Sequence, residues 1–199
     1  MNKFEILKEL LQSNRSYRRF NQKERIDKNH LENLIELTRY CSSGRNLQPL
    51  RYMIITEEEI CDEIFPLLGW AGYLKDWPGP DRGERPAAYI LQFLDTELTG
   101  DCMCDDGLQL ETITLGAVAK GLGCCIIKSF NSKKLIEILG IEERYQPLYV
   151  VAVGYPVETV KIEDMTVEDT DIKYYRTADA IHHVPKRPIS SLIIPKRKI

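Results

Sequence analysis

Apolar side chains recur along the chain at two kinds of spacing, and these spacings predict nine elements. In five stretches the apolar residues stand three or four positions apart, which gives an α-helix one apolar face. These stretches are 1–13, 27–38, 57–68, 105–121 and 131–139. Short apolar runs typical of buried strands lie between them, at 51–56, 87–94, 124–127 and 148–153. This order indicates an α/β or α+β domain with one central sheet and helices on both faces.

The longest predicted helix, 105–121, has a clear start. Asp105 or Asp106 suits the N-cap position. The apolar face of this helix includes small residues such as Ala117 and Gly121, which let another helix approach closely. We therefore expect this helix to be central and to lie at a subunit contact.

The loop between the second helix and the first strand, residues 41–50, is rich in small and amide side chains. This composition leaves backbone and carboxamide groups free to hydrogen-bond a ligand. Basic clusters at 15–19 and 186–187 offer positive charge to the same ligand. In the first cluster, Arg15 and Arg18 flank a serine, a grouping that suits a phosphate, although a solvated basic turn is the alternative.

Aromatic residues gather in the turn-rich segment 69–80, where Trp70, Tyr73 and Trp77 stand among glycine and proline. Such rings either cover a planar ligand or close one end of the core, and both interpretations stay open at this point.

From residue 161 the chain becomes a polar tail without clear periodicity. Its scattered isoleucine, valine, leucine and tyrosine side chains need apolar cover, which an extended terminal segment often finds on a second subunit. We therefore expect residues 161–199 to form an extension that packs on the partner subunit.

Length and charge limit the possible classes of protein. A chain of 199 residues with 43% hydrophobic side chains can bury one core and predicts a single domain, 1–199. A net charge of −3 and scattered charges offer no basic stripe, which argues against a nucleic-acid partner. The N-terminus is charged from the outset, and no apolar run approaches the roughly 18 residues of a membrane span. We expect a cytoplasmic protein without a membrane partner.

Cysteine and histidine are the side chains that most often bind metals or carry redox chemistry. The six cysteines stand at 41, 61, 102, 104, 124 and 125, without the two-residue spacer of common zinc and redox motifs. We expect reduced, structural thiols and no metal site. For His30, His182 and His183 we expect structural or surface roles rather than proton transfer.

Four short motifs occur in an order and spacing that resembles the nitroreductase family. They are Arg15-Ser-Tyr-Arg-Arg-Phe20, Ser43-Gly-Arg-Asn-Leu-Gln-Pro49, Gly121-Leu-Gly-Cys-Cys-Ile-Ile127 and Ala152-Val-Gly-Tyr-Pro156. The resemblance spans nearly the whole chain and includes the basic residue before proline at Arg187-Pro188. It implies an α+β nitroreductase-like fold, with a central mixed or antiparallel sheet flanked by helices, in an intertwined homodimer. It also implies one FMN at each of two sites built from both subunits.

Nine residues match positions that bind the cofactor in that family. They are Arg15, Ser16, Arg18, Ser43, Asn46, Gln48, Ile127, Lys186 and Arg187. By this resemblance the first three contact the phosphate and flavin, and the next three meet the isoalloxazine ring or ribityl chain, usually from the other subunit. Ile127 matches the strand end beside the ring, and the final basic pair matches residues that reach the phosphate. The clusters would then converge across a dimer interface.

Three positions depart from the family pattern. Asn14 stands where many members have a second basic residue, and Leu50 stands where tryptophan is usual. Glu111 stands in the long helix where glutamine is frequent.

The resemblance implies an FMN-dependent oxidoreductase that passes hydride from NADH or NADPH through the flavin to a small planar acceptor, of nitroaromatic or quinone type. No catalytic side chain is expected, because the flavin carries the electrons and the protein supplies position and charge. Arg15 or Arg18 would stabilise the anionic reduced flavin if its guanidinium reaches the ring. Two alternatives stay open: a same-fold flavin enzyme for dehalogenation or flavin breakdown, and a protein that binds flavin without turnover.

Overall fold

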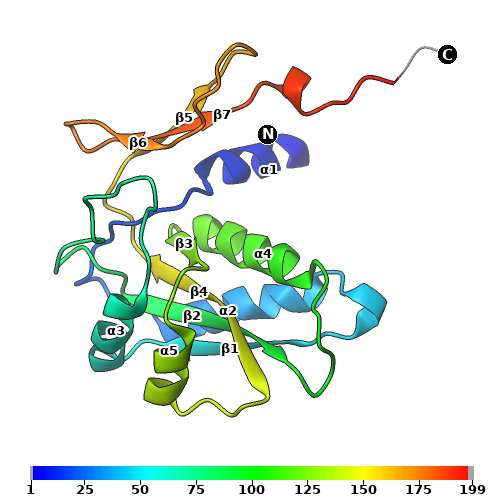
Figure 1. Ribbon diagram of the computed structural model, residues 1–199, viewed down its shortest axis with the longest axis vertical. Helices are drawn as coiled ribbons and strands as arrows, with labels where there is room; N and C mark the ends of the chain where they lie inside the picture. The colour runs from blue at the N-terminus through cyan, green and yellow to red at the C-terminus, as the bar shows by residue number, and fades with distance from the viewer. Residues whose placement is uncertain (1, 197–199) are drawn as a thin grey trace.

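The computed structural model describes residues 2–196, and within them the chain forms two separate sheets (Figure 1). The larger, central sheet has the strand order β1-β2-β4-β3, with every neighbouring pair antiparallel. Its strands are β1 Leu50–Ile55, β2 Ala88–Asp95, β3 Gly123–Ile127 and β4 Tyr145–Gly154. All of β2 is buried, which indicates that both faces of this sheet are covered.

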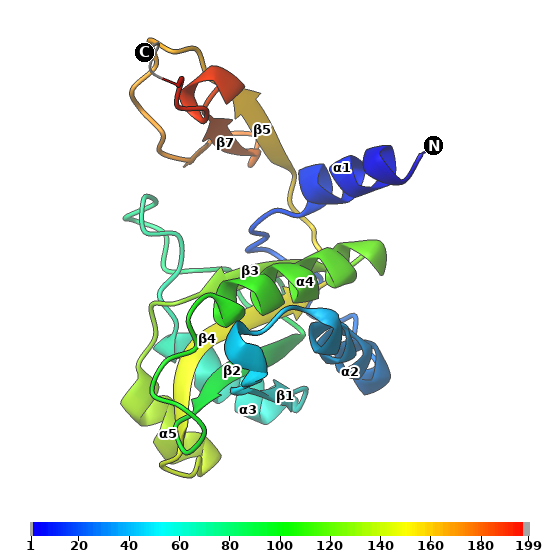
Figure 2. The same ribbon diagram turned by 90° about the vertical axis from the view of Figure 1, so that its right-hand side faces the viewer.

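Helices cover the central sheet in two layers. The α-helices in the described chain are α1 Lys3–Ser13, α2 Lys28–Leu37, α3 Glu58–Ile64, α4 Asp105–Ala119 and α5 Ser132–Leu139. Ile64 of α3 and Leu135 of α5 belong to the core on one face, whereas α2 and α4 form the core on the other face through residues such as Ile113. The helices α2 and α4 lie close together (Figure 2), and a Cβ added to Gly116 would lie 2.5 Å from Leu37.

The nine predicted elements are confirmed, with shifted ends. The strand expected at 148–153 begins at Tyr145, because the preceding residues continue the pairing with β2 past an irregularity in the register. Asp27 caps α2, and its side chain accepts from the backbone N–H of Asn29. The cap predicted for α4 is wrong, since Cys104 occupies that position and Asp105 uses its carboxylate elsewhere. Short 3-10 turns within the described chain lie at Thr38–Tyr40, Gly44–Asn46, Phe65–Leu67 and Ile189–Ser191.

The expected central sheet is confirmed, and the tail folds into a second, smaller sheet, which we call the C-terminal sheet. Its strands are β5 Val160–Asp164, β6 Tyr175–Arg176 and β7 His182–Lys186. The strand β7 lies between the others, parallel to β5 and antiparallel to β6. The C-terminal sheet lies on the far side of α1 from the central sheet (Figure 1). Its strands escape sequence analysis because β7 reads His-His-Val-Pro-Lys, without alternating apolar residues.

Among residues 2–196, no helix has both the length and the apolarity that a membrane crossing requires. The six cysteines are free thiols. In the same part of the chain, no three His, Cys, Asp or Glu side chains gather in a way that would hold a metal ion.

Candidate functional site

The residues that follow α1 run along the outer edge of β3. Ser16 forms a parallel β-bridge with Cys124, and the backbone N–H of Tyr17 donates to the Cys124 carbonyl at 2.9 Å. Phe20 then forms an antiparallel bridge with Pro156, just beyond β4. The first basic cluster is therefore fixed beside β3 by its backbone.

A cleft of about 100 Å³, the N-terminal cleft, opens between this segment, α4 and β3. Its lining residues are Asn14, Arg15, Ser16, Glu111, Thr114, Cys124 and Ile126. The side-chain amide of Asn14 donates to Thr114 Oγ1 at 2.8 Å and to Glu111 Oε1 at 3.2 Å, which ties the segment to α4. Arg15 donates through Nη2 to the Leu11 carbonyl at 2.7 Å, but its buried Nε has no hydrogen-bond partner among the described residues. A charged donor is therefore left for an anion in the cleft.

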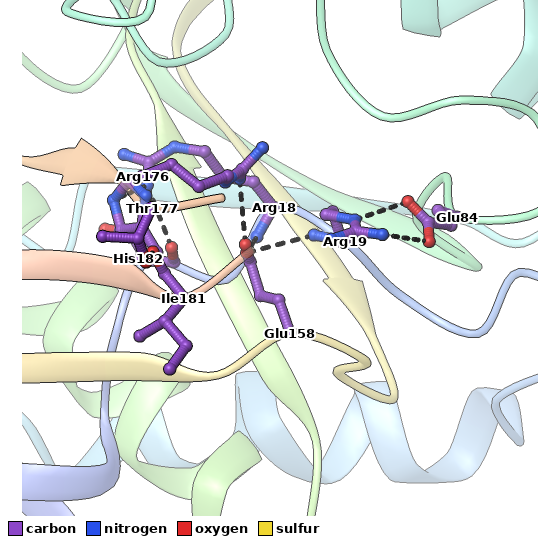
Figure 3. A network of polar contacts seen from close by, with 9 residues as sticks. Arg18, Arg19, Glu84, Glu158, Arg176, Thr177, Ile181 and His182 are labelled. Carbon is purple, nitrogen blue, oxygen red and sulfur yellow. Dashed lines mark hydrogen bonds and ion pairs between the residues drawn. The ribbon is translucent and has the colours of Figure 1, made fainter. Parts of the chain in front are cut away.

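Arg18 is directed toward the C-terminal sheet and does not line the N-terminal cleft (Figure 3). Its Nη1 donates to the Ser16 carbonyl at 3.1 Å and lies 3.2 Å from His182 Nε2. Its guanidinium carbon lies 5.0 Å from the centroid of the Tyr174 ring. Arg15 and Ser16 thus share one cleft, whereas the third predicted contact of this segment is buried behind them.

His182 is the buried partner of Arg18. Burial, together with the positive charges of Arg18 and Arg176, lowers the pKa of His182 to about 4. The ring is therefore neutral at pH 7, and its Nε2 accepts the hydrogen bond from Arg18. His182 thus helps to hold Arg18 in place.

The strand β3 presents Ile126 to the N-terminal cleft, whereas the side chain of Ile127, the residue expected beside the flavin ring, lies on the other face. Neighbouring side chains in a strand point to opposite faces, so a shift of one residue moves a side chain from cleft to core. Ile127 is 4% exposed and packs in the core with α3 and α5, whereas Ile126 is 38% exposed and lines the cleft. Ile127 can meet a ligand in the cleft only through its backbone.

The predicted loop is attached to the start of α4 by one buried carboxylate. Ser43 Oγ donates to Asp105 Oδ2 at 2.6 Å, and the Gly44 N–H donates to Asp105 Oδ1 at 2.9 Å. Ser43 Oγ also accepts from the backbone N–H of Gln48 at 2.9 Å. Asp105 therefore holds the loop of the candidate site, a role that sequence reasoning missed because a carboxylate at a helix start looks like an ordinary cap.

Three residues of this loop adopt the left-handed backbone conformation: Arg45 with φ 52°, Asn46 with φ 58° and Gln48 with φ 49°. Each such residue with a Cβ costs about 1 kcal/mol or more, and surrounding contacts must maintain it. The Gln48 amide turns back onto Asn46 and donates to its carbonyl and to Oδ1, both at 3.2 Å. The loop is thus preformed, with exposed amide groups on its surface.

The loop does not reach the N-terminal cleft of its own chain. Asp105 holds the loop and Thr114 holds Asn14, and these two residues stand nine positions apart on α4, about 14 Å along its axis. Lys186 and Arg187 are exposed at the end of the C-terminal sheet, and within the described chain their side chains form no hydrogen bond or ion pair. The three predicted clusters therefore stay apart in a single chain.

A cavity of about 620 Å³, the β1-edge cavity, adjoins the loop and follows the outer edge of β1. Ser43, Asn46 and Gln48 line it together with residues of α2, β1 and α4. On the α4 side the Tyr52 hydroxyl donates to Gln109 Oε1 at 2.6 Å, and burial raises the pKa of this tyrosine. Within residues 2–196, β1 pairs with β2 alone, so this edge of the central sheet is open.

The aromatic segment is divided between the core and the C-terminal sheet. Trp70 is buried in the core. The Tyr73 ring centroid lies 4.9 Å from that of Tyr174, and the Arg176 guanidinium lies 4.5 Å from the centroid of the Trp77 ring. Trp70 therefore closes one end of the core, whereas the other two rings pack against the C-terminal sheet.

These features define an α+β protein with an antiparallel sheet between two helix layers, an anion-ready cleft on one side of α4 and a preformed amide loop at its start. Residues 11–95 and 103–155 match the model of the Nitroreductase family, and the chain belongs to this family.

Solved structures of other proteins share the fold. A nitroreductase family protein from Streptococcus pneumoniae TIGR4 is 18% identical, with 96% of this chain and 100% of that chain covered and a TM-score of 0.68. An FMN-dependent nitroreductase from Clostridium difficile R20291 is 19% identical, with coverage of 75% and 87% and a TM-score of 0.62. An NADPH:FMN oxidoreductase from Vibrio harveyi, complexed with NAD+, is 22% identical, with coverage of 75% and 68% and a TM-score of 0.60.

Proposed function

We propose that this protein is an FMN-dependent oxidoreductase that passes hydride from NADH or NADPH through the flavin to a small planar acceptor, such as a nitroaromatic or a quinone. Membership of the nitroreductase family supports the proposal. So do the descriptions of two structural relatives as an FMN-dependent nitroreductase and an NADPH:FMN oxidoreductase.

The observation that carries the proposal is the Nε of Arg15 in the N-terminal cleft, which has no hydrogen-bond partner within residues 2–196. A phosphate oxygen suits this charged donor, and Ser16 adds a hydroxyl at the next position. The acidic residue of the lining, Glu111, accepts a hydrogen bond from Asn14. The residues present therefore fit the phosphate of FMN, with Arg15 and Ser16 as its first contacts.

The N-terminal cleft is too small for the whole cofactor. Cofactor sites commonly enclose about 300–1,000 Å³, whereas this cleft measures about 100 Å³. We propose that Ser43, Asn46 and Gln48 of a second copy meet the ring or the ribityl chain, and that Lys186 and Arg187 reach the phosphate. Arg18 contributes by holding the Ser16 carbonyl, and Ile127 contributes through its backbone.

The proposed homodimer would cover apolar surfaces that one chain leaves open. The helix α1 buries none of its residues and exposes Phe4 and Leu7 among others. After β7 the chain exposes large apolar side chains, at Ile189, Leu192, Ile193 and Ile194. Residues 160–186 form a sheet that contacts its own chain. We therefore propose that the part of the C-terminal extension that packs on the partner begins after β7.

The chain's own residues supply binding and electrostatics, and FMN, when bound, supplies the transfer of hydride and electrons. Arg15 places positive charge at the anionic end of the cofactor. The strained loop orients its amides in advance, which lowers the entropy cost of binding. Ile126 offers an apolar wall to the cleft.

Anaerobic mixing of the FMN-loaded protein with NADH or NADPH tests the proposal. We expect loss of the visible flavin absorbance, followed by its return when nitrofurazone or menadione is added. Bound FMN that neither nucleotide reduces would contradict the proposal and favour a protein that binds flavin without turnover. Reduced flavin that is reoxidised by a halogenated aromatic, but not by these acceptors, would favour the dehalogenating alternative.

A further inference from the structure

Glu158 lies in the short connection between the central sheet and the C-terminal sheet, after β4 and before β5. Its side chain is fully buried. Burying a carboxylate is costly unless it is paired and hydrogen-bonded, so its partners indicate what it holds in place.

The two oxygens of Glu158 accept hydrogen bonds from two distant parts of the chain. Oε1 accepts from the backbone N–H groups of Arg18 and Arg19, the latter at 3.2 Å. Oε2 accepts from Nη2 of Arg176 in β6 at 3.0 Å. Figure 3 shows the carboxylate between these two groups of donors. One side chain therefore joins the segment of the N-terminal cleft to the C-terminal sheet.

Glu158 holds the main chain of this segment rather than its arginine side chains. The Arg18 guanidinium donates to the Ser16 carbonyl and to His182 Nε2. The Arg19 guanidinium donates to the two carboxylate oxygens of Glu84, at 2.5 and 2.6 Å. The backbone that Glu158 holds begins two residues after Ser16. Loss of the carboxylate would therefore free the backbone at Arg18 and Arg19 to move. The charges of these two arginines would stay unchanged.

Further contacts hold Arg176, the partner of Glu158 in the C-terminal sheet. The Arg176 guanidinium lies over the Trp77 ring. The Arg18 guanidinium lies over the ring of Tyr174, which is close to Arg176 in sequence. The C-terminal sheet is thus docked through the same few residues that surround Glu158. Anything that displaces the sheet also takes the Arg176 donor away from this carboxylate.

We propose that Glu158 is a positioning residue for the FMN phosphate site, and that through it FMN binding is coupled to docking of the C-terminal sheet. This inference rests on the proposed function. Because coupling between two sites is reciprocal, a looser C-terminal sheet weakens FMN binding, and bound FMN slows opening of the sheet.

Two substitutions at Glu158 separate its two contacts. Glu158→Ala removes both contacts and should weaken FMN binding by tenfold or more, measured by quenching of flavin fluorescence. Glu158→Gln keeps one oxygen that can accept both backbone N–H groups, but turns an amide donor toward Arg176. It should weaken FMN binding by less than about fivefold, whereas tryptic cleavage within residues 160–186 should become severalfold faster.

Glu163→Ala is the matched control. The Glu163 carboxylate accepts from the Tyr175 hydroxyl at 2.9 Å and lies 2.7 Å from His183 Nδ1, entirely within the C-terminal sheet. It should leave FMN binding within twofold of wild type. Equal losses in the Glu158 and Glu163 variants would overturn the proposal, because general damage to the sheet would then explain both.

Hydrogen exchange keeps the test decisive if Glu158→Ala fails to fold. In the wild-type protein, FMN should slow amide exchange in peptides from residues 14–20 and also in peptides from residues 158–186. Slowing in the first region alone would overturn the coupling. A wild-type protein that takes up no FMN would instead overturn the proposed function, whereas FMN bound equally by wild type and a folded Glu158→Ala variant would overturn this inference alone.

Discussion

In the proposed site, phosphate binding depends most directly on Arg15, because its buried Nε has no partner in the described chain. Hydrogen bonds to charged groups contribute about 1.5–3 kcal/mol. Arg15→Ala should therefore weaken FMN binding by roughly 10- to 100-fold in a fluorescence titration. Arg82→Ala is the control, since Arg82 is exposed and pairs with Asp62. Unchanged affinity in the Arg15 variant would show that the phosphate binds elsewhere.

His182 makes the stability of the fold depend on pH. Its pKa of about 4 lies below the ordinary value of 6.5, because burial and nearby positive charges disfavour the protonated ring. The unfolded chain therefore takes up this proton at higher pH than the folded chain does. The free energy of unfolding is undiminished above the ordinary pKa and falls as the pH drops from 6.5 toward 4. The expected loss over this range is about 3 kcal/mol, measured as a declining Tm.

His182→Gln should flatten this decline, because glutamine can still accept from Arg18 but does not titrate. His30→Gln replaces an exposed histidine and should leave the slope unchanged. If the Gln variant at 182 kept the wild-type dependence of Tm on pH between 7 and 5, another group would have to be responsible.

The types of the site residues could be predicted from the sequence, but the directions of their side chains could not. The run Cys-Cys-Ile-Ile at 124–127 is apolar throughout, so no alternation in the sequence shows that the side chain of Ile126 faces the cleft and that of Ile127 faces the core. The direction of Arg18 depends on His182 and Tyr174, which lie far along the chain. Glu158 was missed because an acidic residue in a connection looks like ordinary surface.

At the scale of elements, the attachment of the loop 41–50 to α4 keeps the amide groups of Asn46 and Gln48 in one conformation. Asp105→Ala would remove the acceptor for Ser43 Oγ and the Gly44 N–H. Losing such contacts costs about 1–3 kcal/mol, so we expect a lower Tm and faster tryptic cleavage after Arg45.

Asp106→Ala is the neighbouring control for this prediction, because Asp106 accepts from the Gly107 N–H and does not contact the loop. Equal protection of Arg45 in wild type and Asp105→Ala would mean that the left-handed loop conformation is maintained by other contacts.

The central sheet and its helices were predictable because their apolar periodicity is strong and local. The C-terminal sheet was not, because its stabilising contacts are polar and distant. His183 packs against Tyr175 with ring centroids 4.7 Å apart and contacts Glu163, and β6 contains only two residues. No window of sequence carries such a pattern, since it arises only when three separate segments meet.

At the scale of the whole molecule, one chain holds all the predicted clusters but does not bring them together. The separation of the loop and the cleft along α4 therefore predicts a homodimer. Sedimentation velocity at micromolar concentration should give about twice the chain mass of 23.0 kDa. A monomer that nevertheless binds FMN tightly would contradict the proposed shared site.

The exposed apolar residues after β7 are the proposed contacts with the partner. Combining Ile193→Asp and Ile194→Asp should shift the protein toward the monomer and lower its FMN content together. Val167→Asp changes an exposed apolar residue between β5 and β6 and should alter neither property. A monomer that keeps its FMN would show that the cofactor site does not require the dimer.

The most direct test of the account is the visible spectrum of the purified protein, followed by denaturation and chromatographic identification of any released chromophore. We expect a flavin spectrum and FMN at about one molecule per chain, as the proposed cofactor site at Arg15 and Ser16 requires. A colourless protein that also fails to take up added FMN would contradict the central claim, and the oxidoreductase proposal would fall with it.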